Sequence, residues 1–257
     1  MMVKDIQPIL NGWEFKPNKI SVRKIKGADG SMKLQLRLDL GLLQMELTGR
    51  PDGAKPYGYE SLLEYYEVLL RDYKVKFNSD EGFSLDSESC SELQRECIQY
   101  YHRYLSLFQL REFQAVVRDT QRNLRVFDMI KKYAAEEIDI WNFEQFRPYV
   151  IMMNVRAKVH ISLQLKNHHL ALKQISDGID VIRKFFDEYG QGHLTDSSRE
   201  VIFLENWLKE IQENRPLSAL EKLQRQMERA VENEEYEKAA ILRDRINDLR
   251  SATDIEQ

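Results

Sequence analysis

The chain has 257 residues, 42% of them hydrophobic and 31% charged, and a formal net charge of −4 at pH 7. This length and composition suit a folded protein of one large domain or two modest ones, which can bury a core without disulfides or metal ions. The acidic excess argues against a protein that mainly binds duplex nucleic acid, because phosphate neutralisation by basic residues supplies most of the affinity in such complexes.

Residues 1–56 are predicted to form a small antiparallel β region. From 32 to 40, methionine and leucine alternate strictly with polar residues, and a period of two gives a strand one buried face. Residues 20–26 predict a preceding strand, and the Asp-Gly pair at 29–30 accepts the positive φ of a hairpin turn. Apolar residues alternate again at 43–47, so we expect the strand to continue past a bulge or bend.

A helical bundle is predicted for residues 57–193, followed by a connecting helix at 194–213. Beyond the turn-rich end of the sheet region, apolar residues recur at steps of three and four, as on one face of a helix. Asp86 is a candidate N-cap, and Ser197 with Glu200 has the spacing of a capping box. The helices are expected at about 59–73, 86–108, 112–133, 146–165, 168–189 and 196–213.

The bundle contains a faint internal repeat. Residues 104–127 can be laid on residues 160–183 without gaps, at an offset of 56 residues. Each copy predicts a helix, a short polar turn and a second helix with a small residue near its start, Ala115 or Ala171. The pattern resembles a tetratricopeptide hairpin, although that family repeats at about 34 residues. We therefore expect two antiparallel helical hairpins, with a tetratricopeptide array as the alternative.

The two cysteines, Cys90 and Cys97, are expected to be reduced and buried. They lie seven residues apart, which on a helix is a rise of roughly 10 Å, whereas a disulfide needs Cα atoms within about 7 Å. No apolar run approaches the about 20 residues needed to cross a bilayer, and the first residues lack the apolar region of a signal peptide. These features predict a cytoplasmic protein.

A helical hairpin is predicted for residues 214–251, followed by a tail at 252–257. Pro216 suits the first turn of a helix, and Asn233 is expected to adopt a left-handed conformation that ends it. Apolar residues recur at helical spacing in both halves. Two short helices bury little area by themselves, so we expect a further surface to cover the apolar stripe.

The hairpin also carries a recognisable pattern: Leu220, Met227, Ala230-Val231, Glu235-Tyr236, Ala239-Ala240, Leu242-Arg243-Asp244 and Ile246. It resembles the UVR motif, the UvrB/UvrC-type helical hairpin, with a departure at Val231, where a second alanine is usual. The resemblance is confined to about residues 216–250 and implies a protein–protein docking module that pairs with a like hairpin. The N-terminal region, including LDLGLLQMELTGRPDG, resembles bacterial proteins that carry this motif at their C-terminus.

The sequence lacks the catalytic and metal-binding motifs that accompany the UVR motif in other proteins. There is no G-x-x-x-x-G-K-[ST] phosphate loop, which excludes a helicase or a Clp-type ATPase. There are no C-x-x-C pairs for structural zinc. His160, His168 and His169 lack a carboxylate at a known ligand spacing. We therefore expect no enzymatic activity, no cofactor and no metal site.

Together these patterns predict an α+β protein, mainly α, that acts as a non-enzymatic adaptor. Its partner would be another protein or a second copy of itself, docked through the C-terminal hairpin. Met227 and the apolar residues of the second helix would form the docking stripe, with Arg243 and Asp244 fixing its register. The predicted partner-binding residues are Leu220, Met227, Tyr236, Ala239, Ala240, Leu242, Arg243, Asp244 and Ile246.

Two alternatives rest on other segments. Residues 1–56 carry ten Lys/Arg and six Asp/Glu, which allows a DNA-repair accessory protein that contacts nucleic acid through this basic region. The residues concerned are Arg23, Lys24, Lys26, Lys33 and Arg37. The aromatic residues of segments 100–108 and 57–73 could instead line a ligand groove, although aromatics at helical spacing usually pack in a core.

Overall fold

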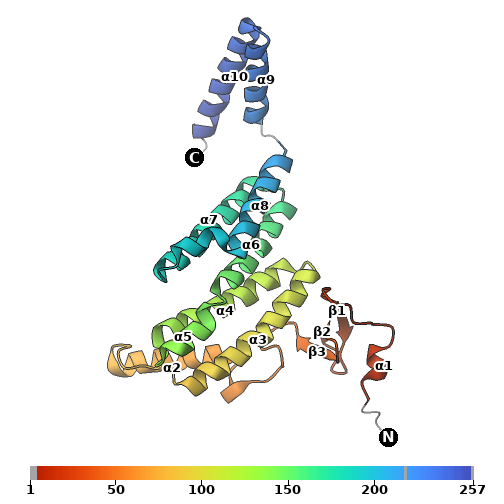
Figure 1. Ribbon diagram of the computed structural model, residues 1–257, viewed down its shortest axis with the longest axis vertical. Coiled ribbons are helices and arrows are strands. Elements are labelled where there is room, and N and C mark those ends of the chain that lie inside the picture. Colours follow the sequence, from red (N-terminus) through yellow and green to blue (C-terminus); the bar gives the residue numbers. More distant parts are fainter. Residues whose placement is uncertain (1–4, 217–218, 256–257) are drawn as a thin grey trace. The chain divides into compact units, whose positions relative to one another are not determined.

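The structure, a computed structural model, describes residues 5–216 and 219–255 (Figure 1). The chain forms two compact units, Met1–Leu208 and Lys209–Gln257. The first unit holds a small sheet and the helical layers, and the second holds the C-terminal hairpin. The fold is α+β and mainly α, as predicted. None of the helices that the structure describes is long and apolar enough to span a membrane.

The sheet consists of β1 (Val22–Lys26), β2 (Met32–Arg37) and β3 (Leu42–Glu46), paired antiparallel in that order. Leu34 of β2 is fully buried and lies opposite Met45, which is also buried. The alternation of a buried and a wet face is wrong for this strand, because the polar Lys33 and Gln35 are also buried and Met32 is 44% exposed. A short helix, α1 (Gln7–Leu10), precedes the sheet.

The predicted continuation of the second strand is wrong, because the chain reverses after Arg37 and forms a third strand. The Leu38 N–H donates to the Gly41 carbonyl at 2.9 Å and closes the reversal. The Arg37 guanidinium also donates to the Gly41 carbonyl, at 2.8 Å. Leu40, part of the alternating pattern, is 89% exposed at this turn. Alternation therefore extended past the strand without marking a buried face.

The helices of the first unit follow the predicted order, with one addition. Asp86 is the N-cap of α3, as expected, and its side chain accepts from the Ser89 N–H at 2.9 Å. The helices are α2 (Leu62–Phe77), α3 (Ser87–Gln109), α4 (Phe113–Tyr133), α5 (Glu137–Glu144), α6 (Arg147–Gln164), α7 (His168–Glu188) and α8 (Arg199–Asn214), with 3-10 turns at Pro56–Gly58 and Gly192–Ser197. The eight-residue α5 was not predicted.

The start of α8 lies one position away from the predicted capping box. Ser198, not Ser197, accepts from the Val201 N–H, at 3.4 Å, and its hydroxyl donates to Glu200. Ser197 instead donates to the Leu194 carbonyl at 2.9 Å, inside the 3-10 turn. Because the Ser197 hydroxyl already bonds within that 3-10 turn, Ser197 does not cap α8.

The helices of the first unit stack as successive layers, in which α4 packs against both α3 and α6, and α6 packs against α7 (Figure 1). The ends of the α3–α4 turn, Gln109 and Phe113, are each matched 55 residues later by Gln164 and His168. The internal repeat is therefore real, but the predicted offset of 56 is wrong by one residue. With the corrected offset, the buried Val116 lies at the position of the buried Ala171.

Both cysteines are free and buried, as predicted. They belong to a hydrophobic core built from α2, α3, α4, α5 and α6. Burial raises the pKa of Cys90 to about 12 and raises the pKa of Cys97 as well. Both thiols are therefore protonated and unreactive at neutral pH.

Candidate functional site

The C-terminal hairpin consists of α9 (Ala219–Glu232) and α10 (Tyr236–Ile255). Glu234 has φ 60° and lies in the left-handed region. The Glu235 N–H donates to the Ala230 carbonyl at 2.8 Å, and the Glu234 N–H donates to the Val231 carbonyl at 3.0 Å. This bond pair is a Schellman turn, which places the left-handed residue directly after the helix cap.

The prediction that Asn233 takes the left-handed conformation is therefore wrong. The Asn233 N–H donates to the Arg229 carbonyl at 3.0 Å, so this residue continues the helical bonding pattern. Its neighbour Glu234 makes the turn instead. Intrinsic preference favours asparagine at such a position, but the length of the helix decides which residue occupies it.

The two helices share a small apolar core. Ala230 of α9 and Ala239 and Leu242 of α10 are buried there, and Leu223 and Met227 pack against them with partial exposure. The alanines let the helix axes approach closely, since neither side chain extends beyond Cβ. A core with two alanines buries little apolar area, so this hairpin gains less from burial than one with leucine at those positions.

The predicted partner-binding residues of α10 divide between two faces of the helix. Ala239, Leu242 and Ile246 follow the spacing i, i+3, i+7 and are all buried. Tyr236 and Ala240 lie on a different face, 66% exposed and half-buried respectively. The first face is therefore the inner surface of the hairpin, and only the second is open to a partner.

Arg243 and Asp244 continue the open face and interact with each other. The Arg243 guanidinium donates to Asp244 Oδ1 from Nε at 3.1 Å and from Nη2 at 3.0 Å. Both side chains are exposed. An exposed pair of this kind contributes little to stability, so both groups can exchange partners at low cost.

Some residues near the predicted stripe need separate mention. Leu220 lies in α9, but its side chain is outside the described part of the chain. Val231 and Ile241 are exposed, the latter at 58%, and neither was among the predicted contact residues. The assignment of partner-binding residues stays a prediction. Of the predicted residues on α10, those on its open face are the ones accessible to a partner.

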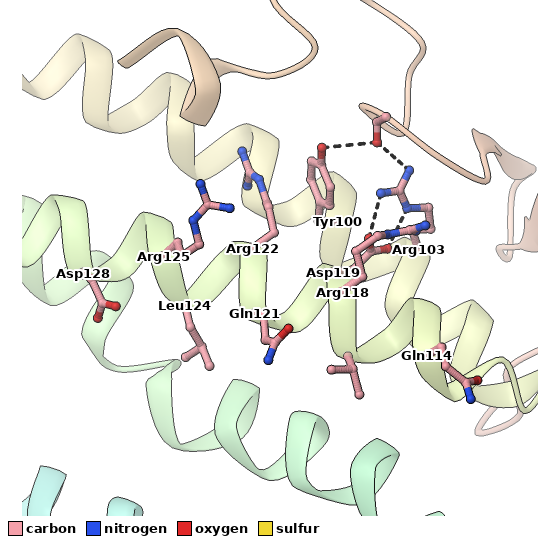
Figure 2. Close-up of a pocket in the computed structure, with 12 residues that line it drawn as sticks. Tyr100, Arg103, Gln114, Arg118, Asp119, Gln121, Arg122, Leu124, Arg125 and Asp128 are labelled. Carbon is pink, nitrogen blue, oxygen red and sulfur yellow. Dashed lines mark hydrogen bonds and ion pairs between the residues drawn. The ribbon is translucent and has the colours of Figure 1, made fainter. Parts of the chain in front are cut away.

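A second candidate site is a pocket of about 710 Å³ along α3 and α4 (Figure 2). We call it the arginine pocket, because Arg103, Arg118, Arg122 and Arg125 line it. Its deepest contact is a buried ion pair, in which Arg103 donates to both carboxylate oxygens of Asp119, at 2.7 and 2.9 Å.

Arginines of this pocket also hold the end of the sheet against the helices. The Arg103 guanidinium donates to the Gly49 carbonyl at 2.8 Å, and the Tyr100 hydroxyl donates to the same oxygen at 3.2 Å. Figure 2 shows Arg103 and Tyr100 at the Gly49 carbonyl. Arg118 donates to the Leu47 carbonyl at 2.9 Å and to Asp119 at 2.9 Å. Part of the arginine cluster is therefore structural.

Glu96 connects the pocket to α2. Its carboxylate is fully buried and accepts from the Leu62 N–H at 2.9 Å. It is also ion-paired with Arg122, and Arg50 lies 3.5 Å away. A carboxylate at the first turn of a helix is stabilised by the unpaired N–H groups there. Three segments far apart in the sequence thus meet at one side chain.

Arg122 is buried among groups that oppose its charge and groups that favour it. Its guanidinium carbon lies 4.1 Å from the centre of the Tyr100 ring, while that of Arg103 lies 4.7 Å from the same ring. Burial lowers the pKa of Arg122 to about 9, and the positive charges of Arg125 and Arg50 act in the same direction. The side chain is charged at neutral pH, because the Glu96 carboxylate and the face of the Tyr100 ring offset part of the cost of burial.

The sequence analysis did not identify the arginine pocket. Arg118, Arg122 and Arg125 occur at i, i+4 and i+7 of α4, a basic stripe that the sequence does show. Such a stripe is typical of a solvated helix face. The tertiary contacts of Arg118 with the Leu47 carbonyl and of Arg122 with Glu96 distinguish it from one.

The basic residues of the N-terminal region make contacts within the chain. Arg23 donates to the Ile9 carbonyl at 2.9 Å, and the buried Lys33 donates to Asp29 at 2.8 Å. Lys24 is ion-paired with Glu112 of the α3–α4 turn. Arg37 donates to backbone carbonyls, as described above. These contacts involve four of the five residues named for the nucleic-acid alternative, and the fifth, Lys26, is exposed.

The aromatic residues around 100–108 line a separate, mostly apolar pocket of about 660 Å³ between α3, α4, α5 and α6. Tyr104 is buried at its base, and burial raises its pKa above the usual range. Tyr101 and Tyr149 stand at its wall with ring centres 6.2 Å apart. Aromatic residues of segment 100–108 thus line a cavity, whereas no residue of segment 57–73 lines it, and no Asp, Glu, Lys or Arg side chain does so.

Comparison with known proteins agrees with the resemblance seen in the hairpin. Residues 218–252 match the family model described as the UvrB/uvrC motif. The match covers the turn, the small core and the open face of α10, and does not extend to the first unit. Searches of the curated proteins and of the solved structures each found no match.

Proposed function

We propose that this chain is a non-enzymatic adaptor that binds another protein, or a second copy of itself, through the C-terminal hairpin. The UvrB/uvrC motif is linked to protein interactions and to nucleotide-excision repair, and this hairpin carries that motif. The observation that supports docking most directly is the open face of α10. Tyr236 lies exposed there, next to a core too small to draw that side chain inward.

The chemistry of the open face suits a protein surface. Tyr236 offers a large ring with a hydroxyl, which is common at the centre of interfaces. Ala240 leaves room for a partner helix to approach, and the Arg243–Asp244 pair can re-form across the interface. A like hairpin would present the same groups in return, which gives a four-helix arrangement.

The test is capture from the native cell with the full chain, with a chain lacking residues 214–257, and with Ala240→Glu. Ala240 is half-buried on the open face, so a glutamate there introduces charge and bulk into the interface. We expect both altered chains to lose the partner. Val75→Glu is a matched control, because Val75 lies on α2 and is 82% exposed.

Sedimentation of the purified chain separates the two kinds of partner. A dimer that Ala240→Glu converts to a monomer identifies a second copy, whereas a monomer that still captures protein from the cell identifies a different partner. Retained capture by Ala240→Glu, with an unchanged circular-dichroism spectrum, would contradict the assignment of the open face.

A further inference from the structure

The arginine pocket holds donor capacity beyond what the chain itself uses. Arg125 reaches Glu67 through a single nitrogen, Nη2, and its side chain is 59% exposed. Arg122 is 8% exposed, and its Nε has no hydrogen-bond partner. This nitrogen is itself buried, so the donors that a ligand can reach belong to Arg125 and to Arg118, whose side chain is 44% exposed.

The charges around the pocket also leave room for an anion. The four lining arginines contact three carboxylates. Asp119 pairs with both Arg103 and Arg118. Glu96 pairs with Arg122, and Glu67 pairs with Arg125. The remaining lining carboxylate, Asp128, accepts from Arg147 at 2.9 Å, and Arg147 lies outside the pocket lining. The arginines therefore exceed the carboxylates that they contact by one positive charge.

The geometry of α4 places the available donors together. Figure 2 shows the guanidinium groups of Arg122 and Arg125 extending from α4 toward the same side. Arg118 lies one turn before Arg122 and is partly exposed. The planar fork of a guanidinium matches the oxygens of a phosphate group, which offers more acceptor oxygens than one carboxylate does.

We infer that the arginine pocket binds the phosphate group of a small phosphorylated molecule, with a nucleotide as a ligand of suitable size. The volume of about 710 Å³ lies within the usual range for small-molecule sites. Arg118 and Arg125 hold the phosphate oxygens, and the buried Arg122 adds positive charge beside them. Arg103 and Asp119 form the fixed floor, because their mutual bonds already use both partners. This inference is independent of the hairpin.

Calorimetric titration of the full chain tests the inference with three probes: pyrophosphate, ATP and adenosine. We expect pyrophosphate and ATP to bind, with an affinity that falls as salt is added, and adenosine not to bind. ATP binding tighter than pyrophosphate binding identifies a nucleotide, and equal affinities identify the phosphate groups alone as the ligand. Failure of pyrophosphate to bind at millimolar concentration, or binding of adenosine comparable to that of ATP, overturns the inference.

Two substitutions on the same helix locate the site. Arg125→Gln removes a charged donor and should weaken pyrophosphate binding about tenfold, as expected for one charge-assisted hydrogen bond. Lys131→Gln is the matched control, because Lys131 also lies on α4, is 43% exposed and pairs with one exposed carboxylate, Glu188, at 2.8 Å. Its binding should equal that of the unaltered chain.

Both substituted chains should melt at the temperature of the unaltered chain, since each loses one exposed ion pair. Equal weakening by the two substitutions indicates general attraction to a basic surface and overturns the assignment of the pocket. The assignment is also overturned if Arg125→Gln binds pyrophosphate as tightly as the unaltered chain.

Discussion

In the α3–α4 hairpin and in the α9–α10 hairpin, a residue other than glycine closes the turn in a left-handed conformation: Arg111 at φ 60° and Glu234 at φ 60°. The bonds are also alike, since the Glu112 N–H donates to the Leu107 carbonyl at 3.0 Å and the Glu235 N–H donates to the Ala230 carbonyl at 2.8 Å. The helices joined by these turns differ in what lies between and around them.

The α3–α4 hairpin is sealed on several sides, whereas the α9–α10 hairpin offers an open face. Leu93, Leu107 and Val116 are fully buried in the first, and the Arg103–Asp119 pair is buried beside them. The second has two alanines and one leucine as its buried cluster. Equal turn chemistry therefore accompanies shared cores of very different size in the two hairpins.

The largest expected effect comes from breaking the buried ion pair of the first hairpin. Asp119→Ala leaves Arg103, which is 1% exposed, without its carboxylate. We expect the free energy of unfolding of the first unit to fall by about 3–5 kcal/mol, because an uncompensated buried charge is left behind. Chemical denaturation measures this.

The control for that substitution lies in the second hairpin. Asp244→Ala removes a carboxylate that also pairs with an arginine, but both side chains are exposed. No measurable change in the denaturation midpoint is expected. A loss below about 1 kcal/mol for Asp119→Ala would show that the first hairpin does not depend on its buried charges.

A smaller effect is expected from the core of the second hairpin. Leu242→Ala removes the largest side chain of the buried cluster and should cost about 2–3 kcal/mol, the lower part of the range for buried leucines, since few side chains surround it. Hydrogen exchange should accelerate at residues 219–255 while the amides of α3 and α4 keep their protection. Accelerated exchange in α3 as well would mean that the two units unfold together.

The smallest effect is expected at the turns, where the two hairpins are alike. Glu234→Gly and Arg111→Gly each place glycine at a positive φ, and each should stabilise its own hairpin by about 1 kcal/mol or less. Thermal melting detects this for the first unit, and hydrogen exchange detects it for the hairpin. Unequal gains would show that one of the two turns is held by contacts beyond its backbone bonds.

The sequence was informative where local rules act alone. The Asp86 cap, the order of the helices and the motif in the hairpin depend on neighbouring residues, and the structure and the family match confirm them. Errors of one residue arose where two local preferences competed, as at Ser197 and Ser198 or at Asn233 and Glu234. The short α5 escaped prediction because eight residues carry too little periodicity.

The arginine pocket could not be predicted from the sequence in the same way. Arg103 and the carbonyl of Gly49 that it contacts are 54 residues apart, and Leu62 and Glu96 are 34 residues apart. No period or motif links such positions in one sequence. The split of the motif residues into an inner and an open face likewise depends on how α9 lies against α10.

Glu96 ties the pocket to a helix that does not line it. The same carboxylate holds Arg122 of α4 and the first N–H of α2, at Leu62. The carboxylate that pairs with the Arg122 guanidinium is therefore the same group that anchors the opening turn of α2. The Arg122 side chain and the opening turn of α2 thus share a single acceptor, and loss of this carboxylate would leave both without it.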